Sequence, residues 1–244
     1  MRKSLRRVSA IFVQDNTSVA LLNSIGITAV SVSGDTRFDR VWEIRQRDNS
    51  LDFMQAFKGD ESCMVAGSTW PEDEELLAAY INRVPKHFKY VIVPHDLREE
   101  HLAGLKNAIG QKVVCFSELG TKPVEDARVL IIDTIGLLTR IYSYADIAYV
   151  GGAFATGLHN TLEPAVFGVP VITGPNYAGF REAEELVGLK GLFPVDGQQS
   201  LDDTLDLFAN NRQLRERTGQ ICADYVKANR GATGHIMAHI HNIL

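Results

Sequence analysis

Short apolar runs rich in β-branched residues recur along the chain, with room for a helix between most of them. Eight runs have this character: VSAIFV, TAVSVS, SCMVAG, FKYVIVP, KVVCFS, RVLIID, DIAYVG and VPVITG. Most are apolar at every position instead of alternating with polar residues, which is typical of strands covered on both faces. The pattern predicts a parallel sheet between two layers of helices.

Segments between these runs have the apolar spacing of helices, and they include PEDEELLAAYINRV, REEHLAGLKNAIG, IGLLTRIYSYA and FREAEELVG. Strands that alternate with helices indicate the α/β class. From Leu201 onward the patterns are helical only, with Gly231 and Gly234 as expected breaks. We therefore expect a Rossmann-like parallel sheet with helices on both faces, ending in helices.

Residues 1–34 supply only a strand, a helix and a second strand, which is too little chain to bury a core of its own. The mixed-charge stretch DTRFDRVWEIRQRDNSLDFMQAFKGDES follows, and we place the domain junction there. We predict that residues 1–34 are the remnant of an N-terminal domain with its linker. Residues 35–244 are predicted to form one C-terminal domain.

Composition narrows the function classes. The chain has 244 residues, 45% of them hydrophobic, with a formal charge of −5 and a pI near 5.8. This charge disfavours a nucleic-acid partner, which needs a basic face. Cys63, Cys115 and Cys222 are too scattered for a disulfide framework or a metal knuckle, and they are expected to be reduced and buried. The basic start MRKSLRR is either a solvated chain end or a contact to anionic phospholipids.

Loops at the carboxyl ends of the strands are candidate sites, because ligands of doubly wound sheets bind there. In GSTWPEDEE, Thr69 and Glu72 fit a capping box with Pro71 in the first turn, so the backbone N–H groups either hold a phosphate or only start the helix. In VIVPHD, Pro94 and His95 end a strand, although a lone histidine is more often structural.

A third loop follows RVLIID, where Ile135, Gly136 and Leu137 are expected to open a helix. Gly136 has no side chain to keep a planar ring from the backbone. By itself this is a weak signal, since glycine is common near helix starts.

The loop GGAFATGLHNTLEP is the strongest candidate. Gly151 and Gly152 permit a sharp turn after a strand, and a helix is expected to start near Asn160 or Thr161. Glu163 then falls in the first turn, where the helix dipole stabilises its charge. Its two acceptor oxygens suit the paired hydroxyls of a ribose, but it is also explained as an ordinary helix-start carboxylate. The absence of a GxGxxG pattern argues against a dinucleotide site.

No metal site or cofactor is expected. The acidic run from Glu72 to Glu75 has the pattern of a solvated first helical turn. His235 and His239 are four residues apart on an expected helix, but no third ligand is visible nearby.

The segment YVGGAFATGLHNTLEPAVFGVPVITGPNYAGFREAEEL resembles the donor-site segment of 3-deoxy-D-manno-octulosonic acid (Kdo) transferases, and GDTRFDRV, AGST and DTIGLLTRIYSYAD agree. The resemblance covers about residues 28–244. It implies the C-terminal, CMP-Kdo-binding half of a GT-B glycosyltransferase. Such enzymes transfer Kdo from CMP-Kdo to a lipid A precursor in lipopolysaccharide inner-core synthesis. They invert the anomeric centre without a bound metal, at the cytoplasmic face of the bacterial inner membrane.

The resemblance also implies which residues contact CMP. His95 departs from the family, because many relatives carry an arginine there. The family's general base and acceptor surface lie in an N-terminal half that these 244 residues do not contain, so no catalytic residue is expected here and the chain is expected to bind the donor without transferring Kdo. The implied CMP-binding residues are Pro94, His95, Ile135, Gly136, Leu137, Asn160, Thr161, Leu162 and Glu163.

Two other functions stay open at this point. Nucleotide-sugar 2-epimerases also pair Rossmann-like domains and use a donor-site glutamate. A non-catalytic nucleotide-binding or interaction module is the second alternative.

Overall fold

A seven-stranded parallel sheet forms the centre of the protein. The computed structural model describes residues 2–5, 7–84, 88–155 and 157–243. Strand order is β5-β6-β4-β3-β7-β8-β9, and every neighbouring pair is parallel. The expected α/β, Rossmann-like sheet is therefore confirmed. The strands are β3 (Ser62–Thr69), β4 (Phe88–Pro94), β5 (Val113–Cys115), β6 (Val129–Ile131), β7 (Ile147–Val150), β8 (Val171–Thr173) and β9 (Leu192–Pro194).

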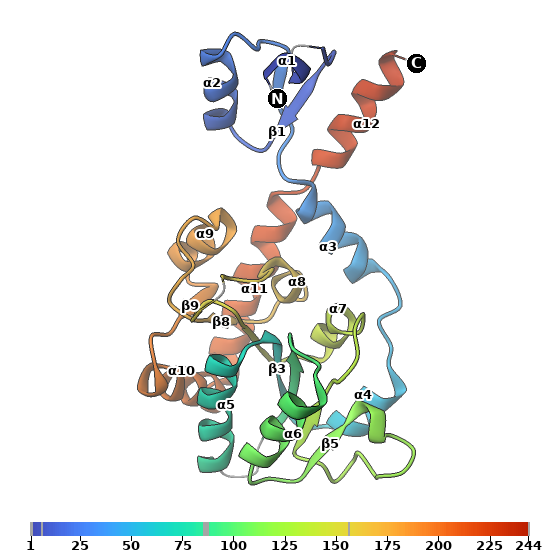
Figure 1. Cartoon of the computed structure of the whole chain (residues 1–244), viewed down its shortest axis with the longest axis vertical. Helices are drawn as coiled ribbons and strands as arrows, with labels where there is room; N and C mark the ends of the chain where they lie inside the picture. Colours follow the sequence, from blue (N-terminus) through green and yellow to red (C-terminus); the bar gives the residue numbers. More distant parts are fainter. Residues whose placement is uncertain (1, 6, 85–87, 156, 244) are drawn as a thin grey trace.

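Helices cover both faces of this sheet (Figure 1). One face packs against α5 (Pro71–Arg83), α6 (Glu99–Ala108) and α10 (Gln198–Asn210). The other face packs against α3 (Thr36–Gln46), α4 (Asp52–Lys58), α7 (Leu138–Ile141), α8 (Leu162–Ala165), α9 (Arg181–Leu189) and α11 (Arg212–Ala228).

Double coverage explains why the strands are apolar at every position. Along β3, Met64 and Ala66 join the core under α5, while Cys63 and Val65 join the core under α4. All four side chains are buried, because each face of the strand meets a helical layer. The three cysteines are buried and free, as expected.

The direction of strand addition reverses between β3 and β7. From β3 the chain adds β4 on one side, continues to β5 and β6, and then returns to place β7 on the other side of β3. This is the switch point of a doubly wound sheet, the place where such sheets bind their ligands. The loops after β3, β4, β6 and β7 all lie at this carboxyl edge.

A separate two-stranded sheet lies at one end of the molecule. It pairs β1 (Ile11–Val13) with β2 (Val30–Val32), and α1 (Arg2–Leu5) and α2 (Asn16–Ser24) accompany it. Figure 1 shows this group beside the C-terminal helix α12 (Ala232–Ile243), away from the large sheet. That residues 1–34 belong to another domain stays a prediction.

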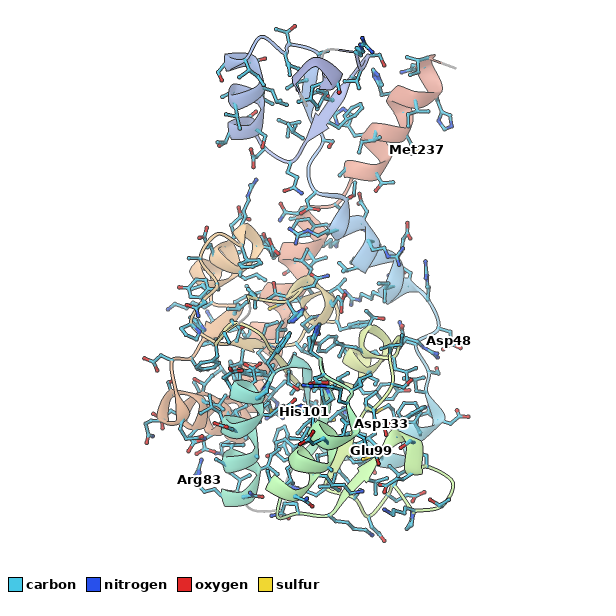
Figure 2. The ribbon with its side chains drawn as sticks, in the orientation of Figure 1. Asp48, Arg83, Glu99, His101, Asp133 and Met237 are labelled. Atoms are coloured by element: carbon cyan, nitrogen blue, oxygen red, sulfur yellow. The ribbon has the colours of Figure 1, made fainter. Side chains whose placement is uncertain are left out.

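Side chains of α12 meet this small sheet. Phe12 of β1 contacts the rings of His235 and His239 edge-on, with centroid distances of 6.5 and 5.2 Å. Met237, on the same helix, is exposed (Figure 2). No described helix is both long and apolar enough to cross a membrane. Arg6 and the side chains of Arg2 and Lys3 lie outside the described part of the chain, so phospholipid contact also stays a prediction.

Several elements differ from the expectations. Helices α3 and α4 lie in the mixed-charge stretch, where no helix was expected, because a few apolar side chains on each are enough to anchor a helix to the core. The domain junction in this stretch stays a prediction. The short strand β9 was not anticipated. Gly234 lies inside α12 instead of breaking it, since one glycine costs a helix only about 1 kcal/mol.

Gly231 does separate α11 from α12, with φ of +119°. Asp39 of α3 caps the new helix there, because its carboxylate accepts hydrogen bonds from the backbone N–H groups of Gly231 and Thr233, both at 2.7 Å.

Gly219→Ala is expected to destabilise the protein by about 1–3 kcal/mol, since a β-carbon on this α11 residue lies 1.9 Å from the carbonyl oxygen of Gly168 and forces the helix off the sheet. Gly188→Ala, in helix α9 with open space around it, is the matched control and should stabilise by up to about 1 kcal/mol. Urea unfolding midpoints measure both changes. Similar midpoints for the two variants would contradict this packing.

Candidate functional site

Loops from β3 and β7 cross in direct contact at the switch point. The backbone N–H of Gly151 donates to the carbonyl oxygen of Gly67 at 3.0 Å, and a β-carbon on Gly151 would lie 2.4 Å from the carbonyl oxygen of Ser68. Ser68 itself has a left-handed φ of +53° at a register shift in β3. Gly152 makes the expected sharp turn with φ of +93°. Gly151 is therefore needed because the backbone at Ser68 occupies the space that a side chain would fill.

A buried carboxylate joins the two loops. Asp73 is fully buried and accepts three hydrogen bonds: from the Tyr149 hydroxyl at 2.6 Å, the Gly152 backbone N–H at 2.9 Å and the Trp70 backbone N–H at 2.9 Å. Burial raises the pKa of Asp73, and the three donors act in the opposite direction. Asp73 therefore fixes the start of α5 against the turn after β7.

This arrangement corrects two expectations about GSTWPEDEE. Trp70 occupies the N-cap position and Asp73 accepts its N–H, so Thr69 and Glu72 do not form the capping box. The acidic run is not a solvated turn either, since Asp73 and Glu74 are buried while Glu72 is exposed. The loops that fold over α5 cause this burial, and they are distant in sequence.

Glu74 links the same loop to α6. Its Oε1 accepts a hydrogen bond from the Thr69 hydroxyl at 2.8 Å, and its Oε2 lies 2.9 Å from Nε2 of His101. Burial raises the pKa of Glu74, with the Thr69 and His101 contacts opposing. Both acidic side chains at the start of α5 thus hold protein groups.

Three rings lie together at the switch point. His95 stacks on Trp70 with centroids 4.5 Å apart and an interplanar angle of 19°, and its ring centroid is 5.1 Å from that of His159. The Trp70 indole N–H donates to Nε2 of His159 at 3.1 Å. His95 is exposed, whereas Trp70 and His159 are half-buried. The loops after β3, β4 and β7 therefore meet through side chains as well as backbone.

Glu163 lies in the first turn of α8, whose N-cap is Thr161. The Asn160 side-chain amide donates to its Oε1 at 3.3 Å, and Asn160 Oδ1 accepts from the Leu162 backbone N–H at 3.1 Å. Burial raises the pKa of Glu163. We had expected the helix dipole to stabilise its charge, but α8 has only four residues, and burial outweighs so short a dipole.

Three other residues expected to contact CMP are buried. Leu162 and Pro94 are buried, so their side chains pack in the protein and only backbone groups are available there. Thr161 is 0% exposed, and its hydroxyl has no hydrogen-bond partner among the described residues. A buried hydroxyl without a hydrogen-bond partner lowers the stability of the fold, so Thr161 destabilises the start of α8.

The loop after β6 is the most open of the candidate loops. Ile135 is 86% exposed and Gly136 has φ of +90°. The helix starts at Leu138 with Leu137 as N-cap, later than expected. Asp133 anchors this loop by accepting hydrogen bonds from the backbone N–H and the hydroxyl of Ser117.

The expected site residues thus come from three loops at one edge of the sheet. His95 and Asn160 are linked through the contact of His95 with His159. The Ile135 loop leads into α7 and Tyr142, and burial, and then the charge of Glu163, raise the pKa of the Tyr142 phenol. Sequence reasoning missed Trp70, Asp73 and His159, although each adjoins a residue that it singled out. CMP binding by the residues that the resemblance implies stays a prediction.

Other parts of the structure offer weaker candidates. A cavity of about 400 Å³ lies at the opposite edge of the sheet, but Lys58 in its wall is already paired with Asp146 at 2.8 Å. Among the residues described, no cluster of three His, Cys, Asp or Glu side chains could hold a metal ion.

Asp73→Asn is expected to destabilise the protein by about 2–4 kcal/mol, because the amide replaces one acceptor oxygen with a donor that faces backbone N–H or hydroxyl groups. Glu72→Gln, its exposed neighbour, should change stability by no more than about 0.5 kcal/mol. Chemical unfolding at neutral pH compares them, and equal stability of both variants would show that Asp73 does not join the loops.

No protein-family model matches the chain. Among curated proteins it is 28% identical to the 3-deoxy-D-manno-octulosonic acid transferase of Haemophilus influenzae, over 95% of this chain and 56% of that protein. It is 32% identical to the transferase of the same name from Chlamydophila psittaci, over 75% of this chain and 43% of that protein. The chain therefore spans about half the length of these relatives.

Solved structures show the same fold. The C-terminal CMP-Kdo binding domain of WaaA from Acinetobacter baumannii aligns with a TM-score of 0.61 at 19% identity, covering 77% of this chain and 96% of that one. A UDP-GlcNAc 2-epimerase from Neisseria meningitidis aligns with a TM-score of 0.67 at 16% identity, covering 98% of this chain and 63% of that one.

Both likenesses concern the fold alone. Together with glycosyltransferase neighbours such as WaaG, they confirm the expected C-terminal half of a GT-B fold. Several Kdo transferases are similar to this chain over most of its length, and not only in the loops on which the resemblance was based. The chain is a relative of the Kdo transferases, and the resemblance in its sequence is confirmed.

Proposed function

We propose that residues 35–244 form the donor-binding domain of a glycosyltransferase that moves Kdo from CMP-Kdo to a lipid A precursor in lipopolysaccharide inner-core synthesis. One observation carries the proposal: the loops after β3, β4 and β7 meet at the switch point, in a chain with Kdo transferase relatives over nearly its whole length. A crevice at this place suits a nucleotide.

Glu163 is the proposed ribose ligand. Asn160 holds its Oε1, and Oε2 is the proposed acceptor for a ribose hydroxyl. Gly136, exposed and without a side chain, is proposed to lie against the cytosine ring. His95 is proposed to face the phosphate with its ring, and Pro94, the buried last residue of β4, is proposed to line the site beside it.

The proposed reaction is an inverting displacement. An acceptor hydroxyl oxygen bonds to the ketosidic carbon, the bond from that carbon to the phosphate oxygen breaks, and CMP departs. A base must take the hydroxyl proton, and we propose that it belongs to an N-terminal half, so that residues 1–244 alone bind CMP-Kdo without transferring Kdo. A monophosphate leaving group needs less charge neutralisation than a diphosphate, which supports a reaction without a bound metal.

We place this activity at the cytoplasmic face of the bacterial inner membrane, because its acceptor would be a lipid. The contact is proposed to be peripheral.

The epimerase alternative is favoured only by the likeness in fold. Nucleotide preference separates the two functions: tighter binding of UDP than of CMP supports an epimerase-like site, and the reverse supports the transferase.

Glu163→Gln is expected to weaken CMP binding at least about tenfold, because one charged acceptor for the ribose is lost. Isothermal titration calorimetry of residues 1–244 measures this. The matched control is Glu216→Gln, an exposed carboxylate at the far edge of the sheet that pairs with Arg212, and its affinity should equal that of the unaltered chain. If millimolar CMP gives no heat of binding, or if Glu163→Gln binds CMP with unchanged affinity, the site assignment is wrong.

Cytidine affinity is expected to fall as the pH decreases from about 8 to about 5. Burial raises the pKa of Glu163, so this carboxylate takes up its proton at a higher pH than an exposed glutamate and then loses an acceptor. The nucleoside is used because it has no titrating phosphate. Glu163→Gln should bind weakly and without this pH dependence, and a parallel decline in both proteins would assign the effect to another group.

A further inference from the structure

Trp70 is the side chain on which three loops converge. Its backbone N–H is held by Asp73, its indole N–H donates to His159, and its ring face supports His95. The His95 backbone N–H also donates to the Thr69 carbonyl oxygen at 2.9 Å, immediately before Trp70. The backbone bond to Thr69 therefore fixes the position of His95, and the indole face of Trp70 sets the tilt of its ring.

The contact with His159 fixes the orientation of the indole. An indole N–H can only donate, so Nε2 of His159 is the acceptor and the neutral imidazole carries its hydrogen on Nδ1. Gly152 permits this placement, because a β-carbon there would lie 2.8 Å from Cδ2 of His159. Trp70 thus has one preferred orientation, with a face toward His95.

The geometry points to Trp70 as a positioning residue, one that presents the His95 imidazole to the phosphate of the nucleotide donor. This inference rests on the proposed function, and it adds the group that makes a histidine effective at that place. An exposed imidazole alone rotates freely and loses rotamer entropy on binding, whereas a stacked ring is already ordered.

The test compares two ligands. Trp70→Leu is expected to weaken CMP binding about tenfold, the value of one charge-assisted hydrogen bond, and to change cytidine binding less than about twofold. Trp70→Phe keeps an aromatic face for His95 and should recover most of the CMP affinity. Trp42→Phe, at the chain's other tryptophan in α3, is the matched control and should bind both ligands normally.

Outcomes separate this inference from the proposed function. Equal weakening of CMP and cytidine in Trp70→Leu, or undiminished CMP binding, overturns the positioning role while the nucleotide site stands. Failure of the unaltered chain to bind either ligand overturns the proposed function and this inference with it. Retained cytidine binding also shows that a variant is folded.

A ligand-free measurement tests the ring geometry by itself. His159 faces Trp70, the imidazole of His95 and the carboxylate of Asp73; burial, and then His95, lower its pKa, while Asp73 opposes them. Loss of the indole hydrogen bond in Trp70→Phe should raise the pKa of His159, because that bond stabilises the neutral ring. NMR titration of His159 measures it, and an unchanged pKa would contradict the contact on which the inference is built.

Discussion

The candidate site depends on the burial of one charged side chain. Removing the carboxylate of Asp73 from water is expensive, and the structure meets that cost with three donors contributed by β7, by the turn after it and by the start of α5. Because two of these donors, Tyr149 and Gly152, are distant in sequence from Asp73, the same bonds that solvate the carboxylate also bring the loops together. The positions of Trp70 and Gly152 follow directly, and those of His95 and His159 follow from the rings.

The sheet could be predicted because burial on both faces leaves a local signature. Cys63 to Ala66 read as a continuous apolar run since each neighbour points into a different core. By contrast, β9 (Leu192–Pro194) contains no β-branched residue and ends in proline, so its sequence lacks the run that marks the other strands. The helix α3 was not predicted because its buried residues, Phe38 and Val41, lie among many charged residues and give no clear apolar spacing.

The site was only partly predictable. Strand ends identified the right loops, because parallel strands align their carboxyl ends at one edge of the sheet. The burial of the individual side chains in these loops could not be predicted. The pattern around Asp73 is that of a solvated turn, and the pattern around Glu163 is that of a helix-start carboxylate; folded loops bury both. Such burial depends on contacts between distant segments, which neither propensity nor periodicity describes.

The cap on α12 links two parts of the chain mechanically. Two connections join the small sheet and α12 to the rest of the protein, one entering α3 and one leaving α11 at Gly231. Asp39 ties them together, since it belongs to α3 and holds the first N–H groups of α12. Asp39 therefore couples α12 to α3. Moving α12 relative to α3 breaks two hydrogen bonds, and moving both helices together disturbs the core contacts of Phe38 and Val41.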